Sequence, residues 1–130
     1  MQPSHAEYIA LYWPYWDDRP LLRTARFIHC IGAGSVGLFT QTTPPQLVSW
    51  AVVDVYTSSI HHLYTLEEYR RRGLASAVVR ELCRKIQAKG EVPLSYIALG
   101  NHTSVALFEK LDFSEQKEGF CFLHTEVTKP

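Results

Sequence analysis

A basic turn that leads into a helix is the part of this sequence best suited to chemistry. The first amides of a helix lack intrahelical acceptors and, together with the helix dipole, attract an anion. A glycine lets a phosphate approach without meeting a Cβ, and neighbouring guanidinium groups add donors. The spacing matches neither a Walker A loop nor the three-glycine dinucleotide fingerprint. The turn therefore predicts a phosphate site, with a solvated basic turn as the alternative. Its residues are Arg70, Arg71, Arg72, Gly73, Leu74, Ala75 and Ser76.

Two elements must hold this turn in place. The residues after it form one apolar helical stripe with charged residues outside, and Lys89 and Gly90 suit the C-terminus of that helix. Pro93 prevents its continuation. The residues before the turn, 60–66, form a β-type run. A strand, the basic turn and a helix that begins at Leu74 are therefore expected in this order.

The rest of the chain alternates helix and strand patterns. Asp17, Asp18 and Pro20 suit a helix start. The run 47–56 is apolar on both alternating faces, as a central strand covered on both sides requires, and a hairpin is the expected connection to the run 60–66. The other expected elements are a helix over 21–29, strands at 35–40 and 94–99, a helix capped by Asn101 or Thr103, and a last strand at 120–127.

Composition narrows the class of protein. The chain has 130 residues, enough for one domain with its own core, and 13 lysines plus arginines balance 13 aspartates plus glutamates. A net charge of zero provides no global field for nucleic acid or an anionic membrane. The three cysteines lie far apart, without metal or redox spacing. We therefore expect a single α/β domain over 1–130 with a mixed sheet, no metal, no nucleic acid or membrane partner, and a cytoplasmic location, with a mitochondrial one as the alternative.

Aromatic residues crowd the N-terminal segment between His5 and Trp16. Pro14 breaks any single helix through them. We expect them to form a layer that covers the sheet or, alternatively, a wall on the substrate side. The residues in question are Tyr8, Tyr12, Trp13, Tyr15 and Trp16.

Two segments resemble signatures of the GNAT superfamily of acyltransferases. Residues 63–75, LYTLEEYRRRGLA, resemble its acyl-CoA motif, Q/R-x-x-G-x-G/A after a strand, with Arg70, Gly73 and Ala75 in the fixed places. Residues 101–113, NHTSVALFEKLDF, look like the second signature, an Asn and a Ser before a helix that ends in KLGF. These two segments and LVSW at 47–50 together look most similar to the C-terminal domain of glycine N-acyltransferase-like proteins, and the similarity extends from about Phe27 to the C-terminus.

The resemblance implies a fold, a cofactor and its binding residues. The fold would be a mixed, mostly antiparallel sheet with helices on both faces and a splayed central strand pair. Acetyl-CoA or another acyl-CoA would be the co-substrate, with its pyrophosphate at 70–76. Asn101 and Ser104 would lie near the far wall of the cofactor groove, although an Asn before a helix is by itself more often a cap. The strand residues along the pantetheine arm would be Leu63, Tyr64 and Thr65.

The same resemblance identifies two departures at the reacting groups. Ser59 stands where many relatives carry a glutamate base, and a serine hydroxyl is not a base at neutral pH. His61 lies two residues on, on the same strand face, and an imidazole with a pKa near 6.5 suits that role; His62 is expected to point the other way. We therefore expect His61 to take the amine proton, or else to be a strand histidine bonded within the sheet. Phe108, in the groove position where many members have a proton-donating tyrosine, can only pack.

These residues support one leading hypothesis and two alternatives. The leading hypothesis is transfer of an acetyl or other short acyl group to the amine of a small molecule or amino acid, by direct attack of the neutral amine on the thioester. One alternative is acetylation of a protein amine. The other is a non-catalytic acyl-CoA-binding module, which the residues at 59 and 108 would suit. The expected partner is a small-molecule amine, and the expected assembly is a monomer or a homodimer.

Overall fold

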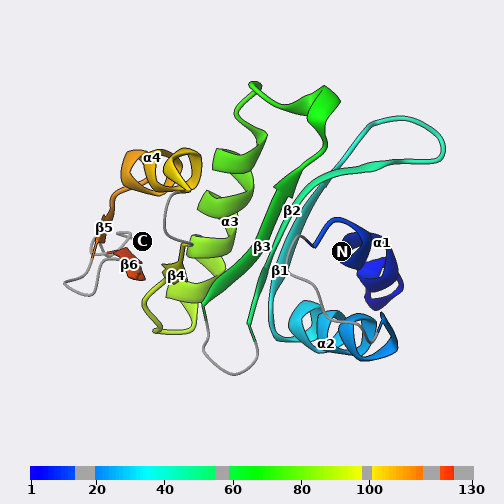
Figure 1. The fold of residues 1–130 in the computed structure, drawn as a ribbon, viewed down its shortest axis with the longest axis horizontal. Helices are drawn as coiled ribbons and strands as arrows, with labels where there is room; N and C mark the ends of the chain where they lie inside the picture. Colours follow the sequence, from blue (N-terminus) through cyan, green and yellow to red (C-terminus); the bar gives the residue numbers. More distant parts are fainter. Residues whose placement is uncertain (14–19, 55–58, 98–100, 116–120, 125–130) are drawn as a thin grey trace.

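A mixed sheet of six strands forms the centre of the molecule, in the order β1-β2-β3-β4-β6-β5 (Figure 1). The computed structural model describes residues 1–13, 20–54, 59–97, 101–115 and 121–124, without the side chains of 20–23, 115 and 121–124. All described strand pairs are antiparallel except β3 with β4. The strands are β1 (Ser35–Phe39), β2 (Leu47–Val53), β3 (Ile60–Thr65), β4 (Leu94–Tyr96), β5 (Phe113–Glu115) and β6 (Cys121–His124).

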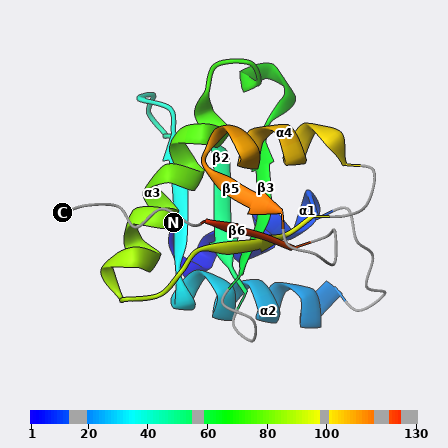
Figure 2. The same cartoon turned by 90° about the vertical axis from the view of Figure 1, so that its left-hand side faces the viewer.

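Helices cover both faces of this sheet, as the sequence predicts. Figures 1 and 2 show α1 and α2 on one face and α3 and α4 on the other. A 3₁₀ turn precedes α1, and a second one precedes the loop that leads to α3. These elements are η1 (Pro3–His5), α1 (Ala6–Leu11), α2 (Pro20–Ala33), η2 (Glu67–Tyr69), α3 (Leu74–Ala88) and α4 (His102–Lys110).

Strand β2 separates two hydrophobic cores, because every one of its residues is buried. On one face, Ala51 packs in a core that contains Leu82 of α3. On the other face, Trp50 packs with Ile9 of α1 and Phe27 of α2. We call these the α3-side core and the α2-side core. The prediction that 47–56 contains a central strand covered on both sides is confirmed over 47–53.

Helix α3 begins and ends at left-handed glycines. Gly73 precedes it with φ 76°, and Gly90 follows its C-cap residue Lys89 with φ 79°. L-residues with a side chain rarely take such angles, so glycine sets both ends of the helix. Between these ends, the buried stripe of the helix includes Val78 and Leu82.

The predicted elements are confirmed within the described residues, with one strand missed. The observed β1, β2, β3, β4 and β6 lie inside the expected ranges, α2 overlaps its expected range, and α3 begins at Leu74. Positions 55–56, 98–99, 120 and 125–127 of the expected strands lie outside the described residues. Strand β5 was not expected, because its 3 residues are too few for a periodic pattern. Its pairing with β6 places it at the sheet edge.

Candidate functional site

Strands β3 and β4 pair only at their beginnings within the described residues. Among the described residues their one registered pair is Ile60 with Ser95, and the Ser95 hydroxyl donates to the Ile60 carbonyl at 3.2 Å. Strand β3 continues to Thr65 and is paired along its other edge with β2. In the described part of the chain, the edge of 63–65 that faces β4 therefore has no strand partner. Its amide and carbonyl groups can pair with an extended ligand.

The loop 70–76 continues from this open strand into α3. Arg71 has a φ of 65° and Gly73 a φ of 76°, so the backbone turns sharply at both. A side chain at Gly73 would meet no atom within 4 Å, which leaves this part of the backbone open to a ligand. The Ala77 amide donates to the Gly73 carbonyl at 3.1 Å, as the first bond of the helix ladder. The amides of 74–76 precede that bond, so they form the anion-attracting N-terminus that the sequence predicts.

The arginines of this loop have different surroundings. Arg70 Nε donates to the Thr65 carbonyl at 2.9 Å, and its guanidinium carbon lies 5.2 Å from the centroid of the Tyr64 ring. The guanidinium carbon of Arg72 lies 5.2 Å from the Tyr69 ring centroid. Arg71 is exposed on the left-handed part of the loop. Arg70 therefore connects the loop to the end of β3, because its side chain contacts Thr65 and Tyr64 of that strand.

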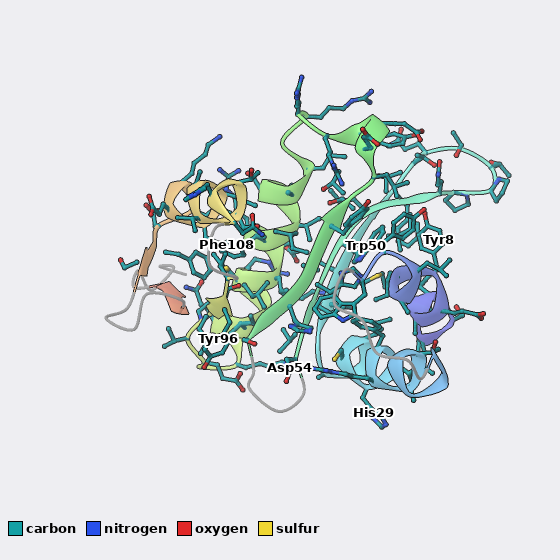
Figure 3. All side chains as sticks on the ribbon, in the orientation of Figure 1. Tyr8, His29, Trp50, Asp54, Tyr96 and Phe108 are labelled. Carbon is teal, nitrogen blue, oxygen red and sulfur yellow. The ribbon has the colours of Figure 1, made fainter. Side chains whose placement is uncertain are left out.

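The second sequence signature forms the start of α4. Asn101 is the N-cap, and its Oδ1 accepts the Ser104 amide at 3.2 Å, so the cap interpretation is confirmed. Phe108, which is labelled in Figure 3, is 3% exposed. It packs edge-on against Phe113 in the α3-side core, with ring centroids 4.9 Å apart. The packing role expected of Phe108 is therefore confirmed. A cofactor contact of Asn101, Ser104 or Phe108 stays a prediction.

A bulge interrupts β3 at two adjacent histidines. Positions 50 and 52 of β2 pair with Tyr64 and His61, so β3 has one residue more than β2 between these pairs. His62 takes a φ of 39° at this point. The ring of Trp13 lies 4.5 Å from the His61 ring and 5.0 Å from the His62 ring, so both histidines lie on the α2 face. The prediction that His62 points away from His61 is wrong, because it assumed the regular two-residue period that a bulge breaks.

His62 is a buried structural donor. Its Nε2 lies 2.6 Å from the Ile9 carbonyl, and since a carbonyl only accepts, the imidazole donates. Its ring also lies 5.0 Å from the Phe27 ring and 5.7 Å from the Trp50 ring. Burial lowers the pKa of His62 to about 4, although the bond to Ile9 opposes this shift. His62 is therefore neutral near pH 7 and connects α1 to the sheet.

His61 has the chemistry of a proton acceptor. The ring is half-buried, and its Nε2 is buried with no hydrogen-bond partner among the described residues. Burial lowers the pKa of His61, the positive charge of Arg26 lowers it further, and Asp54 opposes both effects. Asp54 itself is 4% exposed and accepts a hydrogen bond from Arg26 Nη2 at 2.7 Å. A neutral imidazole with an unused nitrogen can accept a proton in this position.

Ser59 directly precedes β3 and lies two positions before His61. It is buried, and its carbonyl accepts the Asp54 amide at 2.8 Å, which closes the predicted hairpin between β2 and β3. A catalytic role for Ser59 stays a prediction. The sequence analysis missed Arg26 and Asp54 as neighbours of His61. Asp54 carried a signal, because it is the one charged residue in the apolar run 47–56 and so required a partner.

Aromatic rings cover the same face of the sheet. The Trp50 ring is fully buried and stacks on Tyr64 with centroids 5.3 Å apart, while its Nε1 has no partner among the described residues. Figure 3 shows Tyr8 beside Trp50, between the sheet and α1. The covering layer predicted from the N-terminal aromatics is confirmed for the described ones, whereas Tyr15 and Trp16 lie outside the described residues. We call these rings the aromatic cluster: Tyr8, Tyr12, Trp13, Phe27, Trp50 and Tyr64.

A separate hollow of about 720 Å³ lies at the far end of α3, between that helix and the start of β1. Its two lysines already have partners: Lys85 Nζ donates to the Ser35 carbonyl and Lys89 Nζ to the Ala33 carbonyl, each at 3.1 Å. We therefore assign it no ligand. Within the described ranges, no helix has the length and apolar character to cross a membrane, and no three potential metal ligands cluster.

Comparison with known proteins gives a consistent picture. The model of the FR47-like protein family matches residues 35–121. No curated protein matches the chain in sequence. The solved structure of Arabidopsis thaliana NAA60 in complex with acetyl-CoA has a TM-score of 0.75 at 14% identity, over 95% of this chain and 94% of that chain. The ribosomal-protein-S18-alanine N-acetyltransferase of Escherichia coli has a TM-score of 0.62 at 17% identity, over 93% and 84%. A Drosophila protein has a TM-score of 0.76 at 19% identity, over 95% of this chain but 39% of its own. These likenesses establish the fold.

Proposed function

The chain belongs to the FR47-like protein family, and from this premise we propose that it is an acyl-CoA-dependent N-acyltransferase of the GNAT type. The observation that carries the proposal is the junction of β3 and α3. An open strand edge at 63–65 leads, through the loop 70–76, to helix N-terminal amides that have no acceptor within the helix. The first part suits the extended pantetheine arm, and the second suits its pyrophosphate.

The loop would hold the pyrophosphate through its backbone. The amides of 74–76 offer donors that the helix does not use, and Gly73 leaves room for a phosphate oxygen to approach. Arg71 and Arg72 are exposed cations beside these amides. The pantetheine arm carries amides of its own, which would pair with the open edge of β3 as an added strand does.

The bulge would lie at the reacting groups. A neutral amine attacks the thioester carbon, so that a C–N bond forms and the C–S bond breaks, and the amine proton passes to a base. His61 Nε2 supports this role because it is an unused nitrogen on the face opposite α3. The thioester oxygen gains negative charge and needs an amide donor, which the open edge of β3 would supply. The thiolate would leave without a tyrosine donor, since Phe108 occupies that position.

For the acceptor, we propose a small-molecule amine or an amino acid. The support is the resemblance of the two signatures and of LVSW at 47–50 to glycine N-acyltransferase-like proteins. A protein amine is the second candidate, because a structure of the same fold is that of an N-acetyltransferase of ribosomal protein S18. The balanced charge of the chain adds no support for a basic protein tail.

A thiol-release assay tests the activity and the acceptor class together. The chain is mixed with acetyl-CoA or longer acyl-CoAs and with glycine, other amino acids, alkyl amines, aryl amines or short peptides. We expect amine-dependent release of CoA with at least one small amine and less with peptides. Binding of CoA without amine-dependent release would instead support the acyl-CoA-binding module.

The left-handed glycines at the two ends of α3 provide a matched test of the cofactor site. Gly73→Asp places a negative charge beside the proposed pyrophosphate, and like charges 5 Å apart repel by about 3 kcal/mol at an effective dielectric of about 20. Calorimetry should therefore show a CoA affinity lowered about 100-fold. Gly90→Asp is the control, because its φ of 79° and open surroundings impose the same backbone strain without a phosphate nearby. Equal losses in the two variants would contradict the site.

A further inference from the structure

The environment of His61 Nε2 calls for an explanation. Buried polar atoms nearly always have a hydrogen-bond partner, and this nitrogen has none among the described residues. The indole of Trp13 lies against the imidazole, with ring centroids 4.5 Å apart and planes inclined by 45°. An apolar ring that rests on a polar atom prevents water from reaching that atom. Trp13 therefore contributes to the covering of His61.

Trp13 occupies a position from which its ring can be displaced. Helix α1 ends before it, with Tyr12 as the C-cap residue, and the Trp13 amide makes a turn bond to the Ala10 carbonyl at 3.2 Å. Trp13 is thus outside the regular hydrogen-bond ladder of the helix. Its side chain is half-buried and rests edge-on against Phe27 at 5.7 Å. Its ring can therefore move without breaking a backbone bond within α1.

We propose that Trp13 determines which amines reach His61, because its indole covers Nε2 until an acceptor takes its place. The inference rests on the proposed function and narrows its acceptor class. An amine on an unbranched carbon requires a small displacement of the indole. A substituent on that carbon requires a larger one, against the packing of Trp13 on Phe27 and on both histidines. The acceptors selected are therefore primary amines with an unbranched α-carbon.

The charged and titratable groups around His61 come from three elements. Arg26 lies on α2, Asp54 follows β2, and His62 is the next residue of β3. Their effects do not depend on the indole, whereas the burial of His61 does. Removing the indole should therefore raise the pKa of His61 from its lowered value toward 6.5.

Nuclear magnetic resonance tests the covering without requiring activity. The ring signals of His61 are titrated with pH in the wild type, Trp13→Ala, Trp13→Phe and Tyr12→Ala. We expect the pKa of His61 to rise in Trp13→Ala and to stay low in Trp13→Phe, which retains a ring. Tyr12→Ala is the matched control, because its ring contacts Trp50 and Tyr64 and makes no ring contact with His61 among the described residues. The same pKa in Trp13→Ala and the wild type would overturn the proposal. If Trp13→Ala does not fold, Trp13→Leu replaces it in the same comparison.

Acceptor kinetics test the selectivity. The ratio of kcat/KM for an α-branched amine to that for its unbranched counterpart is measured at saturating acyl-CoA. We expect Trp13→Ala to raise this ratio about tenfold or more, the size of discrimination that pocket shape commonly provides, and Trp13→Phe to restore it. A rising limb of the pH profile should also move to higher pH in Trp13→Ala.

An unchanged ratio in an active variant would overturn this inference alone. Absence of turnover in the wild type with every amine would contradict the proposed function, and this inference with it.

Discussion

Two adjacent histidines differ in what they can do, because their nitrogens have different partners. His62 uses its Nε2 to bond the Ile9 carbonyl, whereas His61 Nε2 is buried beside Trp13 without a partner among the described residues. Sequence alone treats the two side chains as equivalent except for the strand face. The bulge brings both rings into contact with Trp13, and we propose that it leaves His61 as the one available for proton transfer.

Replacement of His61 tests that assignment. His61→Ala should lower kcat about 10²–10⁴-fold while CoA affinity changes little, because a general base acts in the transition state. Ser59→Ala, two residues away, is the matched control and should lower kcat much less. In the wild type, kcat/KM should rise with pH through a value below 6.5, since burial lowers the pKa of His61 and the base must be neutral. That limb should be absent in His61→Ala. Full turnover in His61→Ala would exclude His61 as the base.

The joint between β3 and the loop 70–76 gives Arg70 a role in the fold that a glutamine could share. Arg70 Nε donates to the Thr65 carbonyl, and this atom is as many bonds from the backbone as Nε2 of a glutamine. Either residue can therefore tie the loop to the strand. The sequence pattern does not predict this role, because it groups Arg70 with the other cations of the proposed phosphate-binding turn.

Arg70→Ala should thus weaken the fold as well as the binding of CoA. Arg70 is exposed, so loss of its bond to Thr65 and of its contact with Tyr64 should lower the free energy of unfolding by about 1 kcal/mol. Thermal unfolding should show a melting temperature lower by about 3–5 °C. Arg70→Gln should retain most of the stability, whereas Arg71→Gln should lower CoA affinity without changing the melting temperature. A melting temperature in Arg70→Ala equal to that of the wild type would contradict the joint.

For the whole molecule, His62 makes stability depend on pH. Its pKa is about 4 in the folded chain, against 6.5 for an ordinary histidine, so the unfolded state takes up a proton first as the pH falls. Neutral His62 contributes fully to the free energy of unfolding above pH 6.5. As the pH falls from 6.5 to about 4 this contribution decreases, and its complete loss lowers the free energy of unfolding by about 3 kcal/mol.

Denaturant unfolding at several pH values measures this dependence. His62→Gln keeps a donor for the Ile9 carbonyl but does not titrate, so its free energy of unfolding should fall less steeply between pH 6.5 and 4. A residual slope from His61 should remain, because its pKa is also lowered. His29→Gln, on the exposed side of α2, is the control for the loss of one histidine. An identical slope in His62→Gln and the wild type would contradict the buried neutral state.

Most of the fold could be predicted from periodicity, because the spacing of apolar residues along the sequence indicates both the apolar stripe of α3 and the two-sided burial of β2. The turn into α3 was predictable because Gly73 and the start of the helix are adjacent in sequence, whereas its phosphate-binding role stays a prediction. The bulge was not predictable. It coincides with a hydrogen bond between His62 and Ile9, which are 53 positions apart, and no local pattern encodes that contact. Strand β5 was missed because its pairing with β6, and not its own spacing, makes it a strand.

The two-sided burial of β2 has an evolutionary consequence. Ala51 and Val53 belong to the core that supports the layer proposed to bind the cofactor, whereas Trp50 and Val52 belong to the core that supports the layer proposed to meet the acceptor. Substitutions at distant sites without shared partners have nearly additive effects, so changes in α1 or α2 should combine almost independently with changes in α3, which lies on the other face of the sheet. A lineage can therefore change the amine side by altering α1, α2 and the aromatic cluster while α3 and its turn are conserved. In this way one fold could acquire new acceptors while the residues proposed to bind the acyl donor stay unchanged.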